Sequence, residues 1–230
     1  MPITIHASPA VASDEETSVT TASFTSVSGG MLVAMLQCPS NSSPTVSGGG
    51  LTWTRRVRYN SGTIYADIWT APVVTGASMT VSASFTGSLF GAGLKVDVIS
   101  GQHPTDPIGA TGTGTTTTNN ATVTGYESTA DGSRGFCSAL ENAALGTPTS
   151  SDTGSGWLVS ISGFFNSAGL AVRKAADTAN RGTAVTFNLD ASGTSAADWR
   201  WAALEIKPIP AVRPPAPRMP PAAVHRAANW

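Results

Sequence analysis

Several stretches of the chain alternate between hydrophobic and polar residues with a period of two. In SMTVSASF, at residues 78–85, Met79, Val81, Ala83 and Phe85 fall on one face, while threonine and serine fall on the other. The same alternation occurs in residues 63–69, 93–100 and 183–189. Successive side chains of a strand point to opposite faces, so this period indicates half-buried β-strands.

Clusters rich in glycine and serine separate these stretches, at residues 47–51, 61–63, 75–78 and 190–198. Short strands with such turns are typical of a β-sandwich or barrel, and no stretch has a helical period long enough to compete. The sequence therefore predicts an all-β fold, an antiparallel double-sheet β-sandwich resembling a jelly roll. Residues 1–207 are expected to form one domain, because sandwiches commonly use this length.

Two series of strand-like segments follow one another in the same order. They lie at residues 29–37, 50–59, 62–71, 76–85 and 92–101, and then at 133–141, 155–164, 168–177, 182–189 and 197–206. This order predicts two matched five-strand halves, about 15–101 and 120–207. The few shared identities leave chance similarity between strands open. The threonine-rich link at 101–125 is expected to form an edge strand or an extended crossover, with two separate domains as the alternative.

Charge changes this picture mainly at the C-terminal end. Charged residues make up only 12% of the chain, and the net charge is −1. Residues 208–230 include three arginines and no acid, so the rest of the chain has a net charge of −4. The chain lacks the clustered basic face of a nucleic-acid-binding protein, and we expect no nucleic-acid partner.

Cys38 and Cys137 have no metal-ligand spacing to the histidines, and we expect two buried, small, apolar side chains. The N-terminal residues lack the basic start and apolar run of a secretion signal, and no stretch is long enough to span a membrane. The sequence thus predicts a protein made and folded in a cytoplasm.

Candidate catalytic groups are few. The motifs of serine hydrolases, zinc proteases and phosphate-binding loops are missing, and His103 is expected in a loop. Asp67, Asp97 and Glu205 lie in expected strands, where paired carboxylates could hydrolyse sugars. The alternation places Asp67 and Asp97 on an outward face, however, and we expect both to be solvated. The sequence therefore predicts no enzyme, no catalytic residue, no metal and no cofactor.

Five of the six tryptophans lie in expected strands, namely Trp53, Trp69, Trp157, Trp199 and Trp201. Burial of the large ring is the ordinary reason for a tryptophan in a strand, and stacking on a sugar is the alternative. Trp230 differs from these five because it follows a proline-rich segment.

Residues 208–230 contain seven prolines, which favour an extended, polyproline-like segment. Such a segment buries too little apolar surface to fold alone, and we expect it to lie along another protein chain. Met219, Val224 and Trp230 would enter apolar pockets, and Arg213, Arg218 and Arg226 would meet acidic groups. The predicted partner-binding residues are these six together with Pro214 and Pro215.

The run at residues 48–85, together with AGLKVDVISG at 92–101 and WRWAALEIKP at 199–208, resembles a β-sandwich module of phage structural proteins. Such proteins occur in tailed bacteriophages of actinobacterial hosts and are commonly labelled minor tail proteins. The resemblance covers about residues 15–207 and rests on strand pattern. Relatives are often longer, which leaves the location in the particle open.

The resemblance implies a non-enzymatic virion component, either a minor tail protein or a capsid decoration protein, assembled in the host cytoplasm. Its partners would be other capsid or tail subunits, reached through the C-terminal segment, and several copies would form a homo-oligomer in the particle. The alternative function is a carbohydrate-binding adhesin that recognises a glycan on the host surface.

Overall fold

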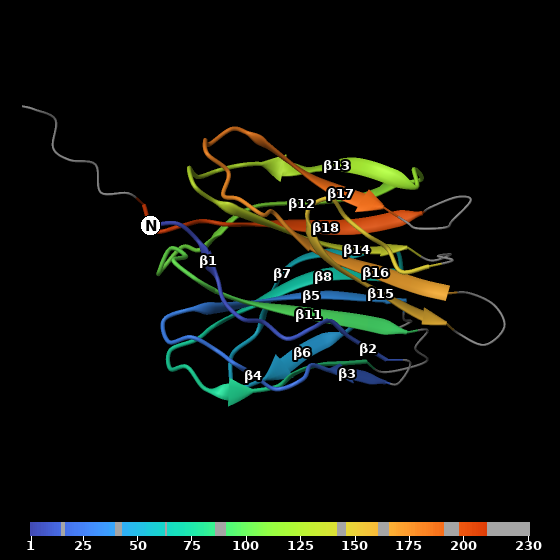
Figure 1. Ribbon diagram of the computed structural model, residues 1–230, viewed down its shortest axis with the longest axis horizontal. Helices are drawn as coiled ribbons and strands as arrows, with labels where there is room; N and C mark the ends of the chain where they lie inside the picture. The colour runs from blue at the N-terminus through green and yellow to red at the C-terminus, as the bar shows by residue number, and fades with distance from the viewer. Residues whose placement is uncertain are drawn as a thin grey trace, which may run out of the picture.

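The computed structural model describes residues 1–14, 17–39, 43–62, 64–85, 91–141, 146–160, 166–190 and 198–210. Every regular element in these ranges is a β-strand, and every ladder between strands is antiparallel. Figure 1 shows the strands stacked in layers. The predicted all-β antiparallel sandwich is confirmed, and the stack has more layers than the expected double sheet.

The larger sheet of the first half has six strands, in the order β1-β11-β5-β8-β7, with β2 also paired to β11. The strands are β1 (Thr4–Ile5), β2 (Ala12–Asp14), β5 (Met31–Pro39), β7 (Thr54–Asn60), β8 (Ile64–Pro72) and β11 (Ala92–Ser100). A bulge interrupts the β7–β8 ladder between Arg55 and Val57.

Two small sheets cover the outer face of this sheet. One has the order β3-β10-β6, and the other is the ribbon β4–β9. The strands are β3 (Ser18–Thr20), β4 (Phe24–Thr25), β6 (Thr45–Gly48), β9 (Ser78–Met79) and β10 (Val81–Ser84). Leu32, Leu36 and Leu94 of the large sheet pack with Val19 and Val81 of the small one. This apolar layer is the core of the first half.

The second half repeats the plan with a five-stranded sheet, β12-β18-β14-β16-β15, and a ribbon, β13–β17. The strands are β12 (Ile108–Thr116), β13 (Asn120–Glu127), β14 (Arg134–Glu141), β15 (Thr153–Ser160), β16 (Asn166–Arg173), β17 (Ala184–Asp190) and β18 (Trp199–Ile206). Leu170, Val172 and Trp199 of the sheet pack with Phe187 and Leu189 of the ribbon. The link between the halves contributes β12, which lies at a sheet edge, as predicted.

The two large sheets have corresponding strand orders. In the first half the order is β11-β5-β8-β7, and in the second it is β18-β14-β16-β15. These strands come from matching positions in the two series of segments recognised in the sequence. The fourth member of each series, which contains β10 or β17, lies in the covering layer.

The two large sheets pack against each other and form the middle of the stack (Figure 1). Val33, Met35 and Ile68 of the first half meet Phe136 and Leu204 of the second. Because the large sheets are covered on both faces, every residue of β14 is buried, and so is all of β11 except its last residue. Four layers therefore enclose three apolar cores.

The predicted solvent exposure of Asp67 and Asp97 is wrong, because each side chain lies under another segment of the chain. Asp67 is 0% exposed and accepts a hydrogen bond from Nε of Arg58 at 2.7 Å. Asp97 is 1% exposed, faces the middle core, and lies 3.3 Å from Nη1 of Arg173 in the opposite sheet. Burial raises the pKa of Asp67, while the bond from Arg58 lowers it in part.

Candidate functional site

Groups suited to catalysis are scattered over the described residues, which contain no cluster of three or more metal-ligating side chains. His6 shares a hydrogen bond of 2.8 Å between its Nε2 and Oγ of Ser100, a contact that joins β1 to the end of β11. His103 lies in a loop, as predicted, where its Nδ1 accepts the N–H of Asp106 at 3.0 Å. These histidines have local structural contacts.

The tryptophans in strands are mostly covered. Trp157, Trp199 and Trp201 are 3%, 0% and 7% exposed, so the prediction that tryptophans in strands are buried is confirmed for these three. Trp69 in β8 is half-buried, and so is Trp53, which lies just before β7 and not in a strand as expected. The guanidinium of Arg55 lies 5.7 Å from the centre of the Trp69 ring, so a cation already occupies one approach to that ring.

The two cysteines are buried and free, as predicted. Burial raises the pKa of both thiols, because the thiolate loses its hydration. Neither thiol is therefore activated as a nucleophile.

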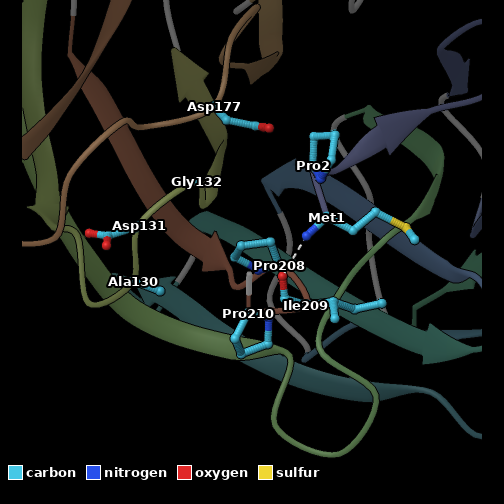
Figure 2. Close-up of a pocket in the computed structure, with 9 residues that line it drawn as sticks. All are labelled: Met1, Pro2, Ala130, Asp131, Gly132, Asp177, Pro208, Ile209 and Pro210. Atoms are coloured by element: carbon cyan, nitrogen blue, oxygen red, sulfur yellow. Dashed lines mark hydrogen bonds between the residues drawn. The ribbon is translucent and has the colours of Figure 1, made fainter. Parts of the chain in front are cut away.

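A groove of about 480 Å³ lies at one end of the stack, where the first and last described residues meet. It is lined by Met1, Pro2, Ala130, Asp131, Gly132, Asp177, Pro208, Ile209 and Pro210. Figure 2 shows residues 208–210 and 1–2 facing the loop of residues 130–132 and Asp177 across the groove. The C-terminal segment leaves the body here, and we take this groove as the candidate functional site.

The groove is largely apolar. Among the described residues, only three large hydrophobic side chains are exposed, namely Met1 at 67%, Val74 at 85% and Ile209 at 36%. Two of these three line the groove. Three prolines add rigid apolar rings to the same lining. An apolar hollow with few charged groups is the usual form of a binding site.

Backbone hydrogen bonds fix the segment that forms the floor of the groove. The N–H of Ile209 donates to the carbonyl of Gly101 at 2.9 Å, and that of Lys207 donates to the carbonyl of Pro107 at 2.8 Å. Pro208 forms a β-bridge with Gln102. Residues 101–107 connect the two halves, so the base of the C-terminal segment is held at the junction between them.

Glu205 fixes the opposite wall. Its buried carboxylate accepts the N–H groups of Thr129 and Ala130, at 2.9 and 3.3 Å, and the hydroxyl of Ser128 at 2.8 Å. It also accepts the N–H of Ala110, at the start of β12, at 2.8 Å. Burial alone raises the pKa of Glu205, but these hydrogen bonds stabilise the carboxylate and bring its pKa below the ordinary value.

The two charged side chains that line the groove are both acidic. Asp177 pairs with Arg134, whose Nε lies 2.6 Å from Oδ1. The same guanidinium donates to the carbonyl of Ile3 at 3.4 Å and thus connects this wall to the N-terminal segment. Asp131 accepts the N–H of Arg181 at 2.7 Å. Figure 2 shows the Asp177 carboxylate directed toward the groove and that of Asp131 directed away from residues 1–2 and 208–210.

The predicted partner-binding residues, all between 213 and 230, lie outside the described residues. Reasoning from the sequence did not find the groove, because its lining comes from four distant segments. The one signal that pointed to this region is the KPIP motif at 207–210, where the proline-rich segment begins. The acids of TADG and KAADT carry no local pattern that indicates a shared wall.

No protein-family model matches the chain, and no match was found among curated proteins or among solved structures. The described residues contain no helix long and apolar enough to cross a membrane.

Proposed function

We propose that the protein is a non-enzymatic structural component of a bacteriophage virion, attached to the particle through its C-terminal segment. It would serve as a minor tail protein or as a capsid decoration protein, in several copies. The observation that carries the proposal is the fixed base of the segment at residues 207–209, followed by a proline- and arginine-rich sequence.

The physical argument concerns the entropy of attachment. A segment that starts from a fixed point and is stiffened by proline loses less conformational freedom on docking than a flexible one. Its three arginines and its apolar residues suit an acidic, partly apolar surface on another subunit. The resemblance of the strand segments to phage structural modules supports a virion as the setting.

Deletion of residues 211–230 tests this proposal. The cut should follow Pro210, because residues 207–209 bond to the body. We expect a folded protein that is absent from purified particles, as measured by quantitative mass spectrometry. A matched variant replaces the three arginines of the segment with glutamine and should reduce occupancy without removing the prolines. Wild-type occupancy of the deletion variant would refute attachment through the segment.

Gold labelling of the protein on intact particles distinguishes the two locations. Label spread over the head supports capsid decoration, whereas label at the tail tip supports a minor tail protein.

A carbohydrate-binding adhesin is the second candidate function. The observation in its favour is that Trp53 and Trp69 are half-buried, so that part of each ring is accessible. A glycan array with the wild type and a Trp69→Ala variant tests this role. Sugar binding that is lost in the variant supports the adhesin, and absence of binding on the array counts against it.

A further inference from the structure

We infer that the outer edge of β17 is a docking site for an extended, uncharged segment of another protein. That segment would add a third strand to the ribbon β13–β17. The site consists of the edge at residues 184–187 and a hollow of about 410 Å³ beside it. This surface goes beyond the attachment proposed above, although Asp177 lines both the hollow and the groove.

The first argument is the direction of the backbone groups of β17. The N–H of Asp190 donates to the carbonyl of Thr149, and its carbonyl accepts the N–H of the same residue. The N–H of Asn188 donates to Oδ2 of Asp152 at 3.0 Å. The backbone groups of Asp190 and Asn188 therefore point away from β13.

At the start of β17 the other orientation is seen. The carbonyl of Thr183 accepts the N–H of Ser128, the residue that follows β13. Backbone groups alternate in direction along a strand, so those of Ala184 and Thr186 point away from β13, as at Asn188. No hydrogen bond between described residues uses these groups. Two N–H and two C=O groups thus form an open edge, which is the form in which sheets accept an added strand.

The second argument comes from the first half, where the corresponding edge is covered. β10, the counterpart of β17, has β3 on one side and pairs with all four residues of β6 on the other. β6 lies between β5 and β7 in the chain, and residues 149–152 lie between β14 and β15. These residues form a bridge from Thr149 to Asp190, and the chain then enters β15. Within the described part of the chain, no strand covers residues 184–187 as β6 covers β10.

The hollow beside this edge suits a strand without charge. Small residues dominate its lining, with four alanines and three threonines. Its charged side chains are already paired, Lys174 with Asp152 and Asp177 with Arg134. Residues 183–187 include no charged residue and no proline, the residues that usually protect an edge from pairing.

The strand β6 indicates the chemistry of the occupant. Its sequence, TVSG, is uncharged, and Val46 is buried between the exposed residues Thr45 and Ser47. A strand with this alternation directs a small apolar side chain toward the sheet and polar ones toward solvent. A second copy is poorly placed to supply its own β17, because residues 174–179 of that copy flank the same edge.

Hydrogen exchange of the isolated full-length protein, followed by NMR, tests whether the edge is open. The amides of Ala184 and Thr186 should exchange at least about a hundredfold faster than that of Asp190, which is bonded to Thr149. Equal protection of the three amides would overturn the inference, since the edge would then already be paired.

A peptide with the sequence of residues 43–48, SPTVSG, and with both ends blocked is the probe for docking. At millimolar concentration it should slow exchange at Ala184 and Thr186 and shift the amide signals of residues 174–179 and 183–187. Thr186→Pro removes one outward N–H but no bond of the ladder to β13, so it should weaken peptide binding about tenfold. Thr186→Val is the matched control, because it keeps the outward backbone groups and should bind like the wild type.

Ala184→Pro is a second variant with the same expected loss, and proline is best tolerated at the first residue of a strand. Absence of peptide-induced shifts would overturn the inference, and so would equal binding by the two proline variants and Thr186→Val. Protection that appears only at high protein concentration, together with the mass of a dimer, would also overturn it by assigning the edge to a second copy. All these measurements use isolated protein, so they are independent of the particle-occupancy test of the proposed function.

Discussion

Substitution of Gly93 by alanine should uncouple the two halves of the molecule. Gly93 in β11 and Gly169 in β16 lie on the two sides of the Trp157 indole, and a Cβ atom on Gly93 would lie 1.9 Å from its Nε1. That nitrogen donates to Oε1 of Gln37 at 2.9 Å, and Nε2 of Gln37 donates to Oγ of Ser138 at 2.8 Å. Alanine at position 93 would therefore displace the indole from a buried network that connects both large sheets.

The expected cost has two parts. Overpacking of a well-filled core costs about 1–3 kcal/mol. Displacement of Trp157 breaks its bond to Gln37 and leaves two buried polar groups unpaired, which adds about 1–3 kcal/mol. We therefore expect Gly93→Ala to lower the free energy of unfolding by about 2–6 kcal/mol.

Denaturation in urea, followed by far-UV circular dichroism, measures this change. Gly50→Ala is the control: no atom lies within 4 Å of its Cβ position, and its φ of +64° gives only the left-handed cost of about 1–2 kcal/mol. A double-mutant cycle with Trp157→Phe tests whether the cost arises from the clash with the indole, because phenylalanine lacks the ring nitrogen that the new Cβ atom would contact. The two substitutions should couple by at least about 1 kcal/mol. Effects that add within about 0.5 kcal/mol would refute the reasoning.

Three further predictions concern the buried polar groups. Glu205→Gln should lower the free energy of unfolding by about 2–4 kcal/mol, because the amide accepts fewer of the bonds from residues 128–130. The pKa of Glu205 is lowered from its ordinary value of 4.5. The stability that its carboxylate contributes is therefore complete above pH 4.5 and is lost as the pH falls through the lower pKa of the folded state. The free energy of unfolding should consequently decrease less on acidification in Glu205→Gln than in the wild type. Cys38 and Cys137 should react with a thiol reagent only after denaturant is added, since both are buried; rapid labelling of native protein would contradict this. Asp97→Ala should cost about 3–5 kcal/mol in urea denaturation, because it leaves the buried Lys95 and the partly buried Arg173 without their carboxylate partner. Asp106→Ala at an exposed pair should cost less than about 1 kcal/mol, and equal costs would contradict the assigned burial.

The strands could be predicted from the sequence because the alternation of apolar and polar residues in a strand depends on the surroundings of its own two faces. In β10, Val81 and Ala83 alternate with serines, since one face meets a core and the other lies at the surface. The matching order of the two strand series also corresponds to the observed order of the two large sheets.

The stacking of the sheets could not be predicted, because it depends on contacts between distant strands. Lys95 and Asp97 in β11 have the spacing of an exposed polar face, yet that face meets Arg173 of the second half. An ion pair lets such a face be buried, and alternation alone does not distinguish it from a solvated one. The groove was missed for a similar reason, since Asp177 and Ile209 approach only in the folded chain.

The position of β18 has a mechanical consequence for any tether that follows it. β18 lies between β12 and β14 and is bonded to both along its length. Antiparallel bonds run perpendicular to the strands, so tension along β18 loads both ladders in shear, and many bonds must yield together. Tension along the edge strand β15 would load only a single ladder, the one it forms with β16. Force applied beyond Pro210 therefore enters the molecule at one of its most resistant points.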